Sequence, residues 1–174
     1  MQRAVSVLKR WARFGPDNPS KLTHIPKGGV CISAFVVVKR GNLILLGLPR
    51  VHDAWPRKGG YAKWRLVEPE MRSAWLLPAT HLQIGEHPDH AARRISHEWA
   101  GLKGKPRFMM IQSHLRRRGR RNHWDLCIVY ELRVRRLPKC KPWWSKMQFA
   151  DSAQIRRMKL GRGHKDVLKE GGYV

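Results

Sequence analysis

Residues 77–102 constrain the fold of this chain more than any other segment. The series His87-Pro88-Asp89 has the composition of a helix start: His87 lies near the N-cap, Pro88 suits the first helical position and Asp89 favours the helix dipole. Gly101 supplies the stop, because a helix often ends in a left-handed residue that glycine adopts without strain. We therefore predict a helix from about Pro88 to Ala100.

Aliphatic and β-branched segments flank this helix. Val30–Val38 and Leu43–Leu48 are separated by Lys39, Arg40, Gly41 and Asn42, which is the chemistry of a β-hairpin turn. Further elements are expected after the helix: strands at Phe108–Leu115, Trp124–Val134 and Met147–Ala150, a helix capped by Asp151 that ends near Leu160, and a short helix at about His164–Glu170.

The charged positions within residues 77–102 resemble the Nudix box, G-x5-E-x7-R-E-U-x-E-E-x-G-U, where U is a bulky aliphatic residue. The fixed positions that the chain keeps are Glu86, Arg94, Glu98, Gly101 and Leu102. The order of predicted elements from about Val30 to Leu168 also looks like that family. The resemblance implies a Nudix-type α/β/α sandwich with a mixed sheet over residues 30–174, preceded by a basic, helical N-terminal extension at residues 1–29.

The departures from the box fall where the family's chemistry lies. Thr80, Ile95, Ser96 and Trp99 replace a glycine, a glutamate, an aliphatic residue and a glutamate. Positions 95, 98 and 99 share one helix face, and in the family their glutamates gather Mg²⁺ for attack on a diphosphate. Only Glu98 remains, whereas Mg²⁺ needs several oxygen ligands. We expect no catalytic residue, no metal and no cofactor, and a largely buried Trp99.

The kept residues have structural interpretations beside the catalytic one. Glu86 and Arg94 are expected to pair and support the helix, although Glu86 and Glu98 are the catalytic candidates if the chain is an enzyme. Solvated side chains are favoured over a metal cluster for His87, His90 and His97. Trp143 and Trp144 could stack on bases, but packing at the last strand is favoured.

The net charge points to an anionic partner. Lys and Arg outnumber Asp and Glu by 36 to 12, which gives +24, and such a surface repels itself unless an anionic partner neutralises it. The candidates are a nucleic-acid backbone, an anionic membrane surface and a large acidic partner. Nucleic acid fits best, because binding of its phosphates releases counterions and so gains affinity. The strands expected at Phe108–Leu115 and Trp124–Val134 would form a second hairpin. The expected phosphate contacts at its tip are Arg116, Arg117, Arg118, Arg120 and Arg121.

The first fourteen residues have no acid and the pattern of an amphipathic helix. Its polar face, Arg3, Lys9, Arg10 and Arg13, is a second expected RNA contact. The segment is interpreted as a mitochondrial targeting sequence, as an arm inserted into an RNA–protein assembly, or as an ordinary terminal helix.

The cysteines and hydropathy restrict the cellular setting. Cys31, Cys127 and Cys140 form no C-x-x-C pair, which argues against a zinc knuckle or disulfide framework and favours a reducing compartment. No apolar run reaches the roughly 18 residues of a membrane span. The expected location is the mitochondrial matrix, on the ribosome, or the cytoplasm of a prokaryote.

Charge and the altered box together predict a non-catalytic, RNA-binding structural subunit of a ribonucleoprotein, namely a ribosomal protein on rRNA. Two alternatives remain open on the sequence alone. One is a Mg²⁺-dependent Nudix pyrophosphohydrolase of a nucleoside diphosphate derivative or RNA end, with metal ligands from elsewhere such as Glu131, Asp125 or Asp151. The other is a sensor that binds a nucleotide without cleaving it. Two or more carboxylates converging on Glu98 would favour the enzyme.

Overall fold

The computed structural model describes residues 29–53, 73–118, 121–136, 138–161 and 163–174, with only the backbone described at 116–118, 121 and 122. The predicted N-terminal helix, with Arg3, Lys9, Arg10 and Arg13, lies outside these residues. The chain divides into two compact units. The first joins the segment that ends at Cys31 to Ser113–Leu126, and the second comprises Ile32–Gln112 and Cys127–Val174.

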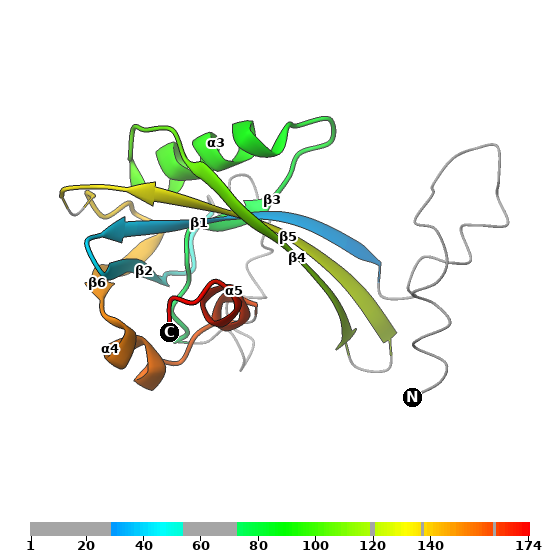
Figure 1. Cartoon of the computed structure of the whole chain (residues 1–174). Coiled ribbons are helices and arrows are strands. Elements are labelled where there is room, and N and C mark those ends of the chain that lie inside the picture. Colours follow the sequence, from blue (N-terminus) through cyan, green and yellow to red (C-terminus); the bar gives the residue numbers. More distant parts are fainter. Residues whose placement is uncertain (1–28, 54–72, 119–120, 137, 162) are drawn as a thin grey trace, which may run out of the picture. The chain divides into compact units, whose positions relative to one another are not determined.

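One sheet runs through the described chain, in the order β4-β5-β1-β2-β6, with β3 also paired to β1 (Figure 1). Its strands are β1 Val30–Arg40, β2 Leu43–Pro49, β3 Ala79–His81, β4 Arg107–Arg118, β5 Arg121–Arg133 and β6 Trp144–Ala150. The pairs β1–β2, β1–β3 and β2–β6 are antiparallel. β5 runs parallel to β1, because Trp124 N donates to Gly29 O and Val134 N to Lys39 O in the same direction. The sheet is therefore mixed, as predicted.

The second unit has three layers. Buried side chains alternate along β1: Ala34, Val36 and Val38 join one core cluster, and Phe35 and Val37 join another. The first cluster includes residues of α3 (Pro88–Ala100), and the second includes residues of α4 (Ser152–Arg157) and α5 (His164–Glu170). In Figure 1, α3 lies on one side of the sheet and α4 and α5 on the other. No helix among the described residues is long and apolar enough to cross a membrane.

Several element ends differ from the predicted ones. β4 continues to Arg118 and β5 already begins at Arg121. Arg116, Arg117, Arg118 and Arg121 therefore belong to strands rather than to a loop. β6 begins at Trp144 instead of Met147, because its ladder with β2 continues to the Pro49–Trp144 pair. α4 ends at Arg157 instead of near Leu160, since Leu160 forms an isolated parallel bridge with Trp75. The beginning of β6 and the end of α4 are determined by partners that are distant in sequence.

Candidate functional site

The helix that carries the kept glutamates, α3, begins and ends as predicted. The Nδ1 atom of His87 accepts a hydrogen bond from Asp89 N at 3.2 Å, and Pro88 is the first helical residue. Gly101 has φ 63°, and its N–H donates to His97 O at 2.9 Å. The side chains of His87, His90 and His97 are exposed, which confirms the expectation of solvated histidines.

Glu86 and Arg94 form a bidentate pair at the start of this helix. Arg94 donates to the Glu86 carboxylate through Nε at 2.7 Å and Nη2 at 2.6 Å, and Gln83 N donates to it at 2.9 Å. The hydrogen bond from Arg94 lowers the pKa of Glu86, and the same bond raises the pKa of Arg94. The predicted structural pairing is confirmed, and it joins the loop before α3 to the helix.

The helix face that holds metal in the Nudix pattern is packed into the core. Ile95 is 0% exposed and Trp99 is 1% exposed, which confirms the predicted burial of Trp99. The rings of Trp99 and Trp144 lie 5.2 Å apart, and Trp144 Nε1 donates to Trp99 O at 2.9 Å. Ser96 is also buried, and its hydroxyl donates to Ala92 O at 2.8 Å. Aromatic and aliphatic surface thus occupies two of the three ligand positions.

Glu98, the third position, is partly buried. Its one interaction within the described part of the chain is electrostatic, with Arg94 one turn earlier on the helix. Three residues that could share a metal ion come together once among the described residues, at a group that does not include Glu98. Glu68 and Glu70 lie outside the described ranges. Within those ranges, the face of α3 that carries positions 95, 98 and 99 therefore presents one carboxylate, that of Glu98.

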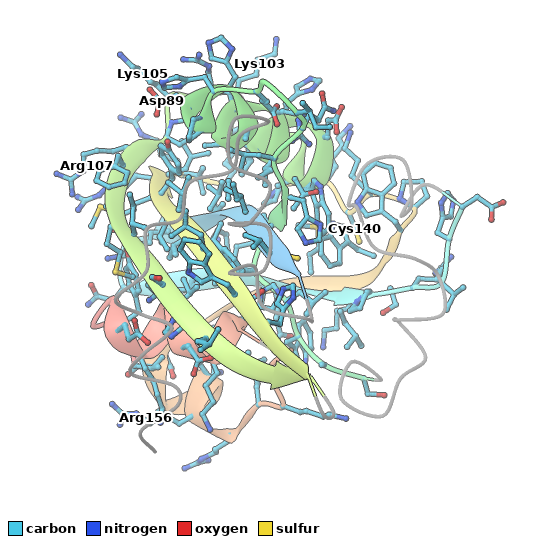
Figure 2. The ribbon with its side chains drawn as sticks, turned by 90° about the vertical axis from the view of Figure 1, so that its right-hand side faces the viewer. Asp89, Lys103, Lys105, Arg107, Cys140 and Arg156 are labelled. Atoms are coloured by element: carbon cyan, nitrogen blue, oxygen red, sulfur yellow. The ribbon has the colours of Figure 1, made fainter. Side chains whose placement is uncertain are left out.

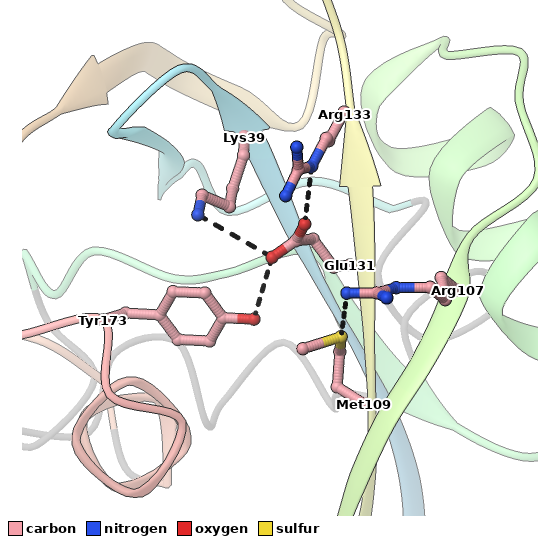
Figure 3. Close-up of polar contacts among 6 residues, drawn as sticks. All are labelled: Lys39, Arg107, Met109, Glu131, Arg133 and Tyr173. Carbon is pink, nitrogen blue, oxygen red and sulfur yellow. Dashed lines mark hydrogen bonds and ion pairs between the residues drawn. The ribbon is translucent and has the colours of Figure 1, made fainter.

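Glu131, a possible metal ligand if the chain is an enzyme, instead forms contacts on the other face of the sheet. The adjacent Tyr130 donates to Asp89 on α3 at 2.6 Å, so the alternation of β5 directs Glu131 to the opposite face. There its carboxylate accepts from Arg133 Nε at 2.9 Å and from the Tyr173 hydroxyl at 3.3 Å, and lies 3.8 Å from Lys39 Nζ (Figure 3).

The surroundings of Glu131 favour its ionised form. Burial opposes ionisation, but the Arg133 hydrogen bond and the charge of Lys39 outweigh it and lower the pKa of Glu131. Burial, together with the Glu131 charge, raises the pKa of Tyr173 to about 12. Glu131 is thus a buried ion-pair residue on the side of the sheet away from α3.

The remaining two substitute ligands are also engaged elsewhere. The Asp151 carboxylate caps α4, on the side of the sheet opposite α3, by accepting from Gln154 N at 2.8 Å. Asp125 belongs to the first unit, where its Oδ1 lies 3.0 Å from His123 Nε2. The idea that Glu131 or Asp151 completes a metal site at Glu98 is wrong for this structure. Both carboxylates have their partners on the side of the sheet opposite α3, which carries Glu98.

Exposed charge on the second unit is predominantly positive. The exposed acids described there are Asp53, Asp89 and Glu170. The exposed basic residues are Arg40, Arg50, Arg93, Lys103, Lys105, Arg107, Arg133, Arg135, Arg136, Lys139, Lys146, Arg156, Arg157, Lys159, Lys165 and Lys169. Figure 2 shows the labelled members of this set pointing outward from the ribbon. The side chains of the arginine run, Arg116 to Arg121, lie outside what the structure describes.

Cys31, His123 and Asp125 form a group that the sequence reasoning did not find. Their sulfur, nitrogen and oxygen atoms all lie within 4.8 Å of one another. Cysteine spacing gave no signal, since the group draws one residue from β1 and two from β5. The i, i+2 spacing of His123 and Asp125 was the available hint, because it places both on one face of a strand.

No family model and no curated protein matches the chain in sequence. Solved structures do match it in three dimensions. The MutT protein of Methanosarcina mazei Go1 has a TM-score of 0.61 at 13% identity, covering 84% of this chain and 95% of that one. The MutT Nudix hydrolase of Burkholderia pseudomallei has a TM-score of 0.58 at 14% identity, covering 80% and 96%. The chain has the Nudix fold.

A third structure with the Nudix fold comes from a complex. The Nudix domain of Shewanella oneidensis NrtR, crystallised with ADP ribose, has a TM-score of 0.58 at 12% identity and covers 99% of this chain and 97% of that domain. At such identities the likeness establishes the fold and not an activity.

Proposed function

We propose that this chain is a non-catalytic Nudix-fold protein that binds RNA as a structural subunit of a ribonucleoprotein, with ribosomal RNA as the first candidate. One observation carries the proposal: Ile95 and Trp99 are core residues where the Nudix pattern places two metal-binding glutamates. Hydrolysis of a diphosphate in this fold depends on a cation that neutralises the phosphate charge, and a single Glu98 is a poor ligand set for Mg²⁺.

The basic surface supports RNA as the partner. Cationic side chains outnumber acidic ones among the exposed residues of the second unit, and the whole chain carries +24. Each phosphate bound by such a surface releases condensed counterions, which contributes affinity that falls as salt is raised. The proposal accordingly includes Arg116, Arg117, Arg118, Arg120, Arg121, Arg3, Lys9, Arg10 and Arg13 as RNA contacts and excludes a membrane partner.

A salt titration tests the RNA contact. Wild-type protein freed of nucleic acid is bound to a fluorescent RNA, and the slope of log affinity against log salt is measured. Replacing Arg116, Arg117, Arg118, Arg120 and Arg121 with Ser should reduce the slope by roughly 0.7–0.9 for each phosphate that the variant no longer binds. The matched control removes the same charge elsewhere, at Arg135, Arg136, Lys139, Arg156 and Arg157. Equal slopes for both variants would contradict a specific role for the hairpin.

A second candidate function is favoured by the structural comparison. The fold is shared with a MutT Nudix hydrolase and with a Nudix domain crystallised with ADP ribose, which makes a Mg²⁺-dependent pyrophosphohydrolase or a nucleotide-binding domain the alternative. An enzyme would need further carboxylates near Glu98, and Glu68 and Glu70 in the segment 54–72 are the acids of the sequence to examine.

An activity assay separates the two candidates. Purified protein with Mg²⁺ is incubated with ADP ribose, nucleoside triphosphates, dinucleoside polyphosphates and capped RNA, and products are separated by chromatography. The proposal expects no turnover above that of a heat-inactivated sample. Turnover that Glu98→Gln abolishes would replace the proposal with the enzyme, and saturable binding of ADP ribose without turnover would indicate a nucleotide sensor.

A further inference from the structure

We propose that Cys31, His123 and Asp125 form a binding site for a divalent transition-metal ion of the zinc class. The site lies in the first unit, on β1 and β5, and is separate from the altered Nudix box. It does not depend on the proposed RNA function.

The sheet brings these residues together. Trp124 N donates to Gly29 O at 3.0 Å, which sets the register between β5 and the residue before β1. His123 and Asp125 flank Trp124, so their side chains leave the same face of β5, and Cys31 comes from the adjacent parallel strand.

The distances suit one shared ion. His123 Nε2 lies 3.0 Å from Asp125 Oδ1, and all three donor atoms fall within 4.8 Å of one another. Tetrahedral zinc with bonds of 2.0–2.3 Å separates its donors by about 3.5 Å. Side-chain rotations that move the donor atoms by about an ångström would therefore bring all three within bonding distance of one ion. A water molecule would complete the tetrahedron.

The donor types select the metal class. Thiolate, imidazole and carboxylate together suit zinc and its neighbours, whereas Mg²⁺ and Ca²⁺ take oxygen ligands. The electrostatics also permit binding in a very basic chain, because one thiolate and one carboxylate balance the charge of a divalent ion. His123 is 2% exposed, and Cys31 and Asp125 are partly buried, so the site is recessed but reachable.

Binding would tie the beginning of β1 to β5 and so stabilise the first unit. Because the ligands bind in deprotonated form, uptake of the metal releases protons and weakens as pH falls. Both effects can be measured without any assay of enzyme activity.

The test uses the full chain, freed of nucleic acid and stripped of metal with a chelator. Zn²⁺ affinity is measured by competition with a chromophoric chelator, and Co²⁺ is added to record thiolate-to-metal absorption. We expect one equivalent bound, a Co²⁺ spectrum of tetrahedral type with a thiolate band, and a rise in the thermal midpoint.

Variants locate the site. Cys31→Ser and Asp125→Asn are near-isosteric, and each should weaken Zn²⁺ by more than the roughly 10–100-fold that outer-shell changes cost. Circular dichroism of each variant shows whether it folds. Cys140→Ser, at an exposed cysteine, and His90→Gln, whose ring lies 5.8 Å from that of His87, are the matched controls and should bind as wild type.

Three results would overturn the inference: wild-type affinity no higher than that of Cys31→Ser, loss of binding in either control variant, or a Co²⁺ spectrum without a thiolate band.

Discussion

Trp99→Glu restores the side-chain type of the Nudix pattern, yet the structure predicts that it unfolds the second unit instead of restoring catalysis. Trp99 is 1% exposed, and its ring lies 5.2 Å from that of Trp144. Removing a large aromatic side chain from a core costs about 3–5 kcal/mol. A carboxylate left there without a partner adds a few kcal/mol more. Since whole domains have stabilities of about 5–15 kcal/mol, little or none would remain.

The assay combines stability and activity. Urea denaturation followed by circular dichroism gives the midpoint for wild type, Trp99→Glu and Trp99→Phe, and each protein is incubated with Mg²⁺ and ADP ribose. Trp99→Phe keeps an aromatic ring in the core and is expected to fold with a loss of about 1–3 kcal/mol. A folded Trp99→Glu protein with a wild-type midpoint and Mg²⁺-dependent turnover would refute the reasoning, since position 99 would then face solvent and metal.

Three further predictions concern the second unit. Glu86→Gln, which removes the carboxylate that Arg94 holds, should lower stability by about 1.5–3 kcal/mol in urea denaturation, and an unchanged midpoint would exclude a stabilising pair. Burial lowers the pKa of His164 to about 3, so its contribution to stability is complete above pH 6.5 and falls by about 1.4 kcal/mol per pH unit as pH drops from there toward 3. Between about pH 6 and 5, the free energy of unfolding of His164→Asn should therefore fall less with pH than that of wild type. If the two proteins lose stability in parallel, His164 is not the cause of the fall. Gly47→Ala would place a Cβ 2.6 Å from the buried Trp144 ring, and we expect a lower thermal midpoint equivalent to about 1–3 kcal/mol; a midpoint equal to wild type would show that the ring can move.

Local chemistry made much of the fold predictable. The caps of α3 depend on His87, Pro88 and Gly101, which act within a few residues of themselves, and the structure has them as the sequence indicates. The β1–β2 turn likewise depends on Gly41 at φ 59°. The sequence also shows directly that two glutamates of the Nudix box are replaced. Helical periodicity shows that positions 95, 98 and 99 share one face of the helix.

The sequence by itself therefore determined the central helix, the hairpin before it and the shortage of carboxylates on that helix. Tertiary structure decided what a linear pattern does not encode: where β6 begins and α4 ends, which face of the sheet Glu131 occupies, and that Cys31 meets His123 and Asp125. The physical reason is the range of the interactions. Caps and turns are satisfied within one or two turns of backbone, whereas ladder registers and side-chain clusters depend on strands that are distant in the chain and are brought together by burial of a common core.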